Sequence, residues 1–411
     1  MKLKNQGKGL GGLLFLSFFL APGVQAKAPE AAAKADVSWY ANINRALMHV
    51  DDGHQKDTYF VDNFSKSSRA GITGETKLDE NLSVGGKLEL ELMSANTYSV
   101  NQLNKNASST TGESAHDGIK IRQVDTWLKS DFGQLSLGHG NTASWTAVAS
   151  DLSGTADTVG YVGPFCMAGG MYFHKKDNTN PLDTVHDPLV KEAFSPYDGF
   201  ARQSRVRYDS PTFAGFTLSA SMYNGGPDRN KLSDDAGTIN YVKYGSDAAL
   251  RYSSNFKDVD VLGAIAFSKM SRGSDDRNQK IWDASLAALH KDTGINAAVN
   301  FARKTLASDS ELGNVTTKKP TFSRVQLGLI KDLNHYGSTN FVVDYSHTKH
   351  ALADDAKGKG YGIGVVQQLK KVNSEVYFAV RKLKYEQIDQ KYDNMLAAMA
   401  GIRVSFGGKL S

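Results

Sequence analysis

The chain has 411 residues with one cysteine, 39 glycines and 22% charged residues, a composition typical of a folded β-rich protein rather than a disordered one. A single cysteine excludes a disulfide scaffold. The 48 basic and 43 acidic residues give a formal net charge of +5, too small an excess for a nucleic-acid binder. No stretch after the N-terminal segment approaches the roughly 18 continuous apolar residues of a membrane-spanning helix, which excludes a helical membrane protein and leaves a β-barrel open.

The N-terminus predicts an export signal. Lys2, Lys4 and Lys8 form a basic region, an apolar run follows over 10–20, and 24–26 (VQA) is a small-residue cleavage site. The apolar run is too short to span a membrane, so we expect cleavage after it rather than a signal anchor. The sequence therefore predicts a signal peptide, a short periplasmic leader, a barrel and a C-terminal overhang, at residues 1–26, 27–36, 37–406 and 407–411.

The rest of the chain repeats one kind of segment. In 82–92 (LSVGGKLELEL), apolar residues alternate with Lys87, Glu89 and Glu91. This period of two is that of a strand with one apolar and one polar face, and no helical spacing fits it. The same alternation recurs in further segments, which lie at 216–222, 295–301, 325–329, 341–345, 361–365 and 396–406.

The connections between these segments alternate in length. Seven are short and turn-like, at 79–81, 131–133, 209–215, 255–258, 291–294, 331–337 and 370–373. Eight are long and polar, at 51–64, 93–118, 141–200, 224–244, 271–279, 304–321, 348–358 and 385–394. They join sixteen strands, and an even number with short turns on one side and long loops on the other is typical of a bacterial outer-membrane barrel.

The polar faces separate a membrane barrel from a soluble β-sandwich. They carry residues such as Lys87, Glu89, Arg205, Arg207 and Arg403, too many charges for a packed protein interior. In lipid, a β-sheet can pair all of its backbone groups only as a closed barrel, whose apolar face is turned outward. Aromatic residues also gather beside the short turns, as at an interfacial girdle, at Phe132, Tyr208, Phe213, Phe216, Tyr252, Phe256, Tyr336, Phe341 and Phe406.

Three segments resemble the Gram-negative general porins. They are 67–75 (SSRAGITGE), 122–124 (RQV) running into 131–138 (DFGQLSLG), and 206–216 (VRYDSPTFAGF). The resemblance is collinear over nearly the whole mature chain. It departs at His139, where the family often has arginine, and at Gly407–Ser411, which follow the usual terminal aromatic.

The resemblance implies an all-β, 16-stranded antiparallel transmembrane β-barrel in the bacterial outer membrane. The family forms homotrimers whose long third loop, here 141–200, folds into the lumen. The implied partners are outer-membrane lipid and lipopolysaccharide, the barrel-assembly machinery, and small hydrophilic solutes and ions, with no nucleic acid. The expected function is passive diffusion, and Phe406 is expected to be the terminal assembly signal.

In the family, carboxylates of the third loop face a basic wall of strand residues across the narrowest part of the pore. For the basic wall we expect Arg69, Lys87, Arg122, Arg205 and Arg207. The alternation leaves undecided whether Arg122 points inward, because Arg122 shares its parity with apolar residues that could face lipid. For the loop carboxylates we expect Asp151 and Asp157, in the descending part of the loop.

Four Asp-Asp pairs lie in the long connections. One interpretation is that acidic pairs simply suit exposed loops. The other is that the paired carboxylates bind Ca²⁺ or Mg²⁺, with the cation shared between the protein and lipopolysaccharide phosphates. These candidate residues are Asp51, Asp52, Asp234, Asp235, Asp275, Asp276, Asp354 and Asp355. No cofactor is expected and no metal site is firmly predicted.

No enzyme motif is present. There is no G-x-S-x-G, no H-E-x-x-H and no phosphate-binding loop, and the histidines lack ligand spacing. Cys166 is expected to be a buried apolar side chain. The alternatives to a general porin are a substrate-specific channel, a barrel-embedded hydrolase, and a secreted β-rich binding module.

Overall fold

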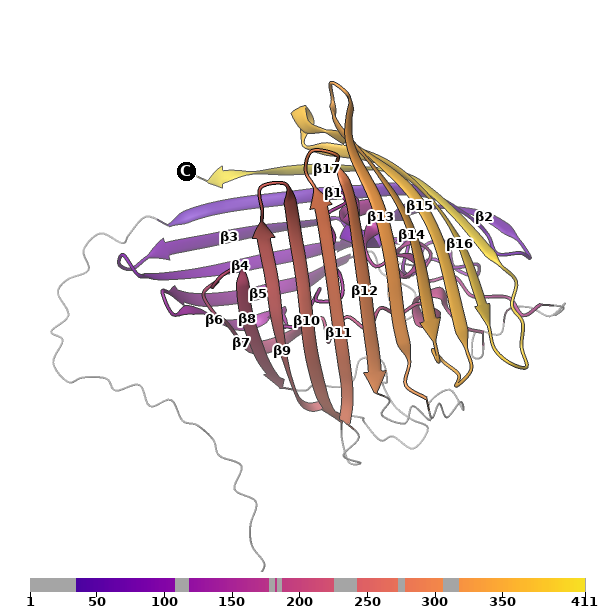
Figure 1. The fold of residues 1–411 in the computed structure, drawn as a ribbon, viewed down its shortest axis with the longest axis horizontal. Coiled ribbons are helices and arrows are strands. Elements are labelled where there is room, and N and C mark those ends of the chain that lie inside the picture. The colour runs from indigo at the N-terminus through magenta and orange to yellow at the C-terminus, as the bar shows by residue number, and fades with distance from the viewer. Residues whose placement is uncertain are drawn as a thin grey trace, which may run out of the picture. The chain divides into compact units, whose positions relative to one another are not determined.

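A computed structural model describes residues 35–107, 118–176, 182, 187–224, 242–272, 278–305 and 318–410. Within them, seventeen strands form one antiparallel sheet (Figure 1). The strands are β1 (Asp36–Asp51), β2 (Lys56–Asp62), β3 (Arg69–Lys77), β4 (Leu82–Met93), β5 (Gly118–Ser130), β6 (Gly133–Asn141), β7 (Arg202–Asp209), β8 (Phe216–Asn224), β9 (Val242–Asn255), β10 (Val259–Arg272), β11 (Asn278–His290), β12 (Ile295–Thr305), β13 (Thr321–Asn334), β14 (Gly337–Lys349), β15 (Lys357–Leu369), β16 (Ser374–Glu386) and β17 (Met395–Leu410).

The sheet closes on itself. The first strand β1 pairs with the last, β17, from Val37 opposite Leu410 to Asp51 opposite Leu396. β2 pairs with the second half of β1, and β3 with the first half. β2 and β3 therefore lie end to end along the same neighbour, β1, and count as one interrupted strand. The barrel thus has the sixteen antiparallel strands that the alternation predicts.

Two predicted boundaries are wrong. The connection predicted at 51–64 contains β2, and a tight turn at Asp52 joins it to β1, where the Asp52 amide donates to the Gln55 carbonyl at 3.1 Å. The predicted overhang at 407–411 is part of β17 up to Leu410, since Gly407–Leu410 pair with Val37–Tyr40. The predicted strand stopped at Phe406 because glycines hide the alternation that follows.

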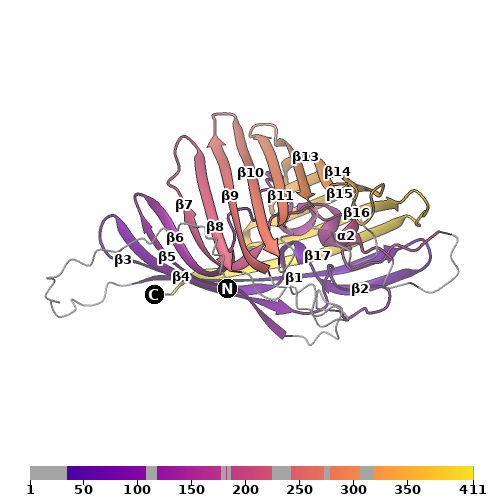
Figure 2. The same ribbon diagram turned by 90° about the horizontal axis from the view of Figure 1, so that it is seen from below.

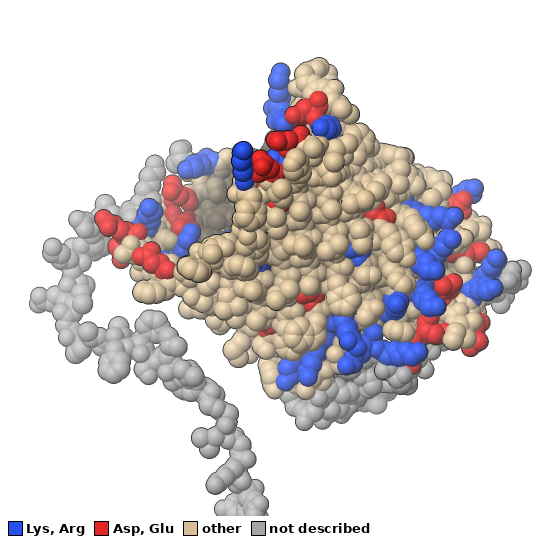
Figure 3. Space-filling view, viewed as in Figure 1, with Lys and Arg blue, Asp and Glu red and all other residues tan. Residues whose placement is uncertain are grey.

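The outward face of the barrel is apolar. Side chains such as Ile265, Leu286 and Val325 are about half exposed there. In a membrane this apolar surface contacts lipid, which is favourable. Figure 3 shows the same face as a broad uncharged surface, with Lys and Arg gathered toward its edges. No helix among the described residues is long and apolar enough to cross a membrane.

The segment between β6 and β7 lies against the inner face of the barrel. Successive inward side chains donate to its carbonyls: Ser285 of β11 to Ala147 at 2.6 Å, Asn300 of β12 to Val148 at 2.8 Å, and Arg381 of β16 to Val159 at 2.8 Å. The loop contains the short helices η2 (Ala156–Gly160), α1 (Pro164–Met167) and α2 (Val190–Ala193). Figure 2 shows α2 among the strands on this side.

Apolar packing holds the second half of this loop. Phe173 and Phe194 lie in one buried cluster with Tyr385 of β16 and Met395 of β17. The Phe173 and Tyr385 rings stack with centroids 5.6 Å apart. The loop is therefore fixed by hydrogen bonds along its first half and by a hydrophobic contact along its second.

Candidate functional site

A cluster of charges lies on the inner face of β3, β4 and β5. Arg122 donates from Nε to Glu89 at 2.8 Å and from Nη1 to Glu91 at 3.0 Å. Arg69 Nη1 and Lys87 Nζ lie 3.9 Å and 3.6 Å from the Glu89 carboxylate. Alternation places the side chains of β3 and β4 inward, and each carboxylate between cations offsets part of the cost of burying charge.

A β-bulge decides which way Arg122 points. Glu89 of β4 pairs with Gln123, and the next residue, Leu90, pairs with Ile121, so Arg122 is the extra residue of β5. The bulge reverses the alternation. Arg122 and Gln123 therefore both lie on the inner side, while Val124 is 47% exposed on the outer one.

The loop carboxylate Asp157 meets a second group of cations. Asp157 Oδ2 lies 2.5 Å from Lys66 Nζ and 3.1 Å from the Arg403 guanidinium of β17. Arg403 also donates to Glu375 of β16 at 2.6 Å. Asp157 lies in the first turn of η2, and the hydrogen bond from Arg381 to Val159 holds that turn against β16.

The exposed fraction of each side chain separates the charges that water reaches from those that are buried. The side chains of Asp157 and Lys66 are 42% and 36% exposed, and that of Lys87 is 27% exposed. Glu89 and Arg122 are 5% and 10% exposed. The side chains of Asp157, Lys66 and Lys87 are therefore the most exposed charges of the two groups, and the other charges are more deeply buried.

Arg205 and Arg207 lie at the root of the loop. Arg205 makes a two-fold contact with Asp125 at 2.8 and 2.6 Å, and it donates to the Asn141 carbonyl. Arg207 binds Asp209 and donates to the Thr142 carbonyl at 2.9 Å. The charges of these two arginines are thus paired locally, and Asp157 is bonded instead to Lys66 and Arg403. That the loop carboxylates face the basic wall across the pore stays a prediction.

Asp151 holds a turn. Its Oδ1 accepts from the Ser153 amide at 2.6 Å, and its Oδ2 is buried with no hydrogen-bond partner among the described residues. Asp151 makes no ion pair with any described residue of the basic cluster. Of the two predicted loop carboxylates, the structure brings only Asp157 to cationic side chains in the described part of the chain.

The loop also contains a buried carboxylate. Asp198 accepts a hydrogen bond from the Tyr161 hydroxyl at 3.1 Å. Burial raises the pKa of Asp198 to about 7, although the Tyr161 bond and the nearby Arg251 lower it. Burial also raises the pKa of the Cys166 thiol, which is free and buried. That environment makes Cys166 a poor nucleophile, because the thiolate is the reactive form.

The described Asp pairs hold turns. Asp52 is 2% exposed and accepts from the amides of His54 and Gln55 at 2.9 and 2.7 Å. Asp51 pairs with Lys56 at 3.0 Å. Among the described residues no group of three or more His, Cys, Asp or Glu side chains is placed to hold a metal ion.

The second described pair has the same role. Asp354 accepts from the Lys318 amide at 2.8 Å, and Asp355 from the Ile388 amide at 2.5 Å. These oxygens are therefore engaged by the chain itself, which weakens the case for a divalent cation there. The other four predicted acids lie outside the described residues: Asp234, Asp235, Asp275 and Asp276.

Family comparison accounts for this architecture. The chain matches the Gram-negative porin family over residues 20–387. The chain belongs to the Gram-negative porin family. This porin is a multi-pass β-barrel of the bacterial outer membrane and forms a pore for passive diffusion. No curated protein sequence matches it.

Solved structures share the fold of this porin at low sequence identity. An anion-selective porin from Comamonas acidovorans is 15% identical with a TM-score of 0.58, over 91% of this chain and 100% of that one. The outer-membrane channel DcaP of Acinetobacter baumannii is 13% identical with a TM-score of 0.54, over 91% and 100%. In-vitro folded OmpT, an outer-membrane protein of Vibrio cholerae, is 14% identical with a TM-score of 0.53, over 90% and 98%.

Sequence reasoning missed several residues of the site. Arg403 and Arg381 lie at inward positions of their strands, so the alternation of apolar and polar residues indicates the direction of both. It does not indicate which loop residues they contact. Lys66 carries no such signal, since it lies in the short helix η1 (Phe64–Lys66) between β2 and β3. Asp344 was missed too, although it bridges Arg381 at 2.7 Å and Arg324 at 3.4 Å.

Proposed function

We propose that the third loop narrows this pore at η2, where Asp157 faces the cations of the barrel wall. Small hydrophilic solutes and ions then pass between Asp157 and Lys66 on one side and the cluster containing Lys87 on the other. The observation that carries this proposal is the exposure of these three charges, in contrast to their buried neighbours. Opposite charges across a narrow aqueous path create a transverse field, which orients polar solutes and sets ion preference.

The pore carries out no chemical reaction in this proposal. The charged groups of the site are paired with one another, and Cys166 is a buried thiol. A substrate-specific channel is the alternative, and it would saturate with its substrate, whereas a diffusion pore passes solutes in proportion to their concentration. A liposome-swelling series with neutral sugars of increasing size separates the two.

We further propose a homotrimer, with β1 and β2 in the subunit interface. Arg45 lies in the middle of β1 on the outward face, where it donates to Ser94 at 2.6 Å. His49 and Thr58 hydrogen-bond on the same face at 2.9 Å. An outward arginine at mid-membrane costs about 2–4 kcal/mol against lipid, so a protein surface is the better neighbour. One of the similar structures is a trimer form of Vibrio cholerae OmpT.

The pore proposal is tested by reversal potentials across a salt gradient in planar bilayers. We expect Asp157→Asn to shift selectivity toward anions, and Lys66→Gln with Lys87→Gln to shift it toward cations. Asp292→Asn is the matched control, because Asp292 is exposed in a short turn away from the loop. Unchanged selectivity in both site variants contradicts the proposed location of the constriction.

The assembly proposal is tested by the mass of the detergent-solubilised protein. We expect Arg45→Glu to weaken the trimer, because glutamate cannot donate to Ser94 and would place an unpaired carboxylate in the interface. Arg303→Glu on β12 is the control, since Arg303 is also exposed and lies on a strand that does not neighbour β1. A monomeric wild-type protein, or equal loss in both variants, contradicts this interface.

A further inference from the structure

Asp283 is a buried carboxylate of the barrel wall that the described chain leaves without a partner. It lies on the inner face of β11 and is 3% exposed, and neither of its carboxylate oxygens accepts a hydrogen bond from a described residue. Its neighbours directly across the sheet are Ala266 of β10 and Ala302 of β12, whose side chains offer no polar group. A buried charge is stable only when it is paired or hydrogen-bonded. The wall itself therefore does not satisfy this carboxylate.

The returning end of the third loop brings further oxygens to Asp283. Asp283 interacts electrostatically with Asp198 of the loop, whose Oδ1 is buried without a hydrogen-bond partner in the described part of the chain. The next residue, Gly199, lies beside β10, since a Cβ there would be 3.4 Å from the Ser268 hydroxyl oxygen. Ser268 is fully buried, and its hydroxyl has no partner among the described residues either. The Gly199 amide approaches Asp283 but donates to the Tyr197 carbonyl at 3.0 Å.

The charges in this cluster do not balance. Asp283 also lies within electrostatic reach of Asp247 and Arg251. Two backbone amides and two serine hydroxyls donate to Asp247, which stabilises its charged form. Arg251 donates to two carbonyls of the loop and makes no ion pair with Asp283 or Asp198 in the described chain. Three carboxylates and one guanidinium therefore leave an excess of two negative charges.

One divalent cation would balance this excess. The oxygens without partners are both carboxylate oxygens of Asp283, one of Asp198 and the hydroxyl of Ser268. Ca²⁺ takes about six to eight oxygen ligands in flexible geometry, whereas Mg²⁺ demands a near-ideal octahedron and Zn²⁺ favours nitrogen and sulfur. Water from the lumen would supply the remaining ligands. Because only two carboxylates reach the ion, we expect a weak site, with a Kd of about 10⁻⁴–10⁻³ M.

We propose that Asp198, Asp283 and Ser268 bind one calcium ion between the returning end of the third loop and strands β10 and β11. The ion neutralises two carboxylates that repel each other, and in its absence protons must take over part of this role. The site is separate from the Asp pairs of the long connections and from the contact of Asp157. It therefore does not depend on where the pore narrows.

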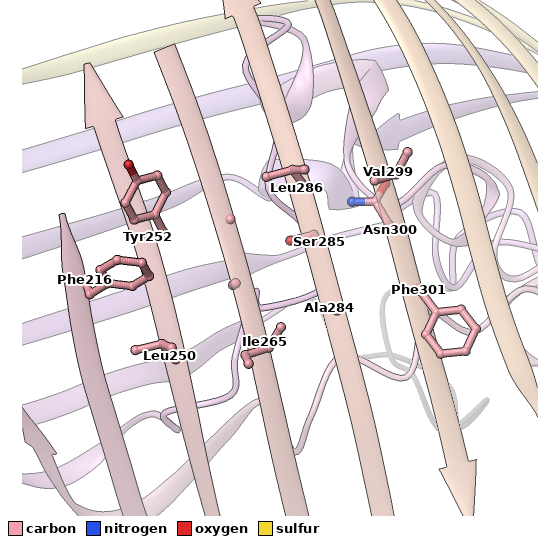
Figure 4. A pocket seen from close by; sticks show the side chains of 12 residues that line it. Phe216, Leu250, Tyr252, Ile265, Ala284, Ser285, Leu286, Val299, Asn300 and Phe301 are labelled. Carbon is pink, nitrogen blue, oxygen red and sulfur yellow. The ribbon is translucent and has the colours of Figure 1, made fainter. Parts of the chain in front are cut away.

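The ion would fasten the end of the loop to the strand that already holds its beginning. Two residues along β11 from Asp283, Ser285 donates to the Ala147 carbonyl near the start of the loop. Asp198 lies at the other end, shortly before β7 begins at Arg202. Figure 4 shows Ser285 in the lining of an apolar hollow on these strands, which includes none of the three proposed ligands. With the ion bound, both ends of the loop are held to β11.

Terbium(III) is the probe, because it occupies oxygen sites of Ca²⁺ and emits when a tyrosine beside it is excited. The Tyr161 hydroxyl donates to Asp198 at 3.1 Å, so its ring lies close to the proposed ion. The full-length protein, purified in detergent and freed of metal with EDTA, is titrated with terbium and then with Ca²⁺. The site variant is Asp283→Asn, and the matched control is Asp292→Asn, which removes the same charge from an exposed turn. Tyr161→Phe removes the sensitising phenol and leaves both carboxylates.

We expect saturable emission that Ca²⁺ displaces in the wild type and in Asp292→Asn. Asp283→Asn should bind terbium at least tenfold more weakly. Tyr161→Phe should emit little, yet Ca²⁺ should raise its melting temperature as it raises that of the wild type. Ca²⁺ should leave the melting temperature of Asp283→Asn unchanged. In EDTA this variant should melt at the same or a higher temperature than the wild type, because it loses like-charge repulsion, and this also shows that it folds.

Four results overturn the proposal. One is equal affinity for terbium in Asp283→Asn and the wild type. Another is full emission from Tyr161→Phe, which would place the terbium elsewhere. The third is equal stabilisation of Asp283→Asn and the wild type by Ca²⁺. The fourth is displacement of terbium by Mg²⁺ as readily as by Ca²⁺, which would remove the assignment to calcium.

Discussion

The carboxylate of Asp157 lies 3.1 Å from the guanidinium of Arg403, so the third loop is joined to the last strand of the barrel. Lys66, beside the interruption between β2 and β3, completes this contact at 2.5 Å. The loop begins at β6 and reaches these residues after passing β11, β12 and β16. Its charged turn is thus held by side chains of η1, β16 and β17, next to the strand pair that closes the barrel.

The buried pair between Arg205 and Asp125 should stabilise the root of the loop. Arg205→Met leaves the Asp125 carboxylate, only 10% exposed, without its partner. We expect a loss of about 3–5 kcal/mol in the free energy of unfolding. The double variant Arg205→Met/Asp125→Leu should recover much of this loss, because it removes both charges.

Urea unfolding in lipid vesicles measures this effect. Arg303→Met is the control, since Arg303 is exposed on the outward face of β12, and it should change the unfolding free energy little. Equal losses in the single and double variants would show that the ion pair itself is not responsible.

The residues after Phe406 should be needed to close the barrel. Gly407–Leu410 pair with β1, so deleting 407–411 removes ladder hydrogen bonds at the seam and should lower the yield of folded barrel. The heat-dependent shift of the band in an SDS gel measures that yield. Lys409→Ser/Leu410→Ser keeps the backbone and should fold normally. A truncated chain that folds like the wild type refutes this role.

Phe406 itself remains predicted as the assembly signal. It is 47% exposed on the outward face and pairs with Ala41. Phe406→Ala should therefore slow insertion by the assembly machinery while leaving spontaneous folding in detergent nearly unchanged. A defect of equal size in both assays would indicate a packing role instead.

Stability should fall as the pH rises from about 4 to about 7 because of Asp198. Its pKa is raised to about 7 by burial in the folded protein and is about 3.9 when unfolded. The folded state therefore holds a proton that the unfolded state releases in this window, and its stabilising effect is lost as the pH passes 7. Asp198→Asn should flatten the dependence of the unfolding free energy on pH.

Melting curves between pH 4.5 and 8 measure this dependence. Asn keeps an acceptor for the Tyr161 hydroxyl, so the change isolates the charge. Asp292→Asn, at an exposed position, should leave the slope unaltered. A slope that persists in Asp198→Asn would assign the titration to another group.

Gly138 should not tolerate a side chain. Its φ is +144°, and a Cβ would lie 2.2 Å from the Val124 carbonyl oxygen of the neighbouring strand. Gly138→Ala should cost about 1–3 kcal/mol of unfolding free energy. Gly263→Ala is the matched control, because its nearest neighbour, the Leu286 Cδ1, lies at 3.4 Å. Equal urea midpoints for the two variants would contradict this account.

Alternation along the chain is enough to predict the barrel and the inward face of residues such as Lys87 and Glu89. It succeeds because a strand has a period of two and lipid enforces an apolar outer face, so each segment reports its own orientation. The seven short turns follow for the same reason, since a turn is a local structure. Each of the seven contains the connection between two consecutive strands of the structure, although 331–337 begins inside β13, which runs to Asn334.

Tertiary structure decides what depends on distant parts of the chain. The direction of Arg122 is set by a bulge against β4, which a period of two cannot show. The partner of Asp157 is Arg403, and the two meet because β17 closes the barrel beside β1 and the loop crosses the inner face. Arg205 looked like a free pore cation from its parity alone, but pairing with Asp125 makes it a support of the loop, because a buried charge is stable beside an opposite one.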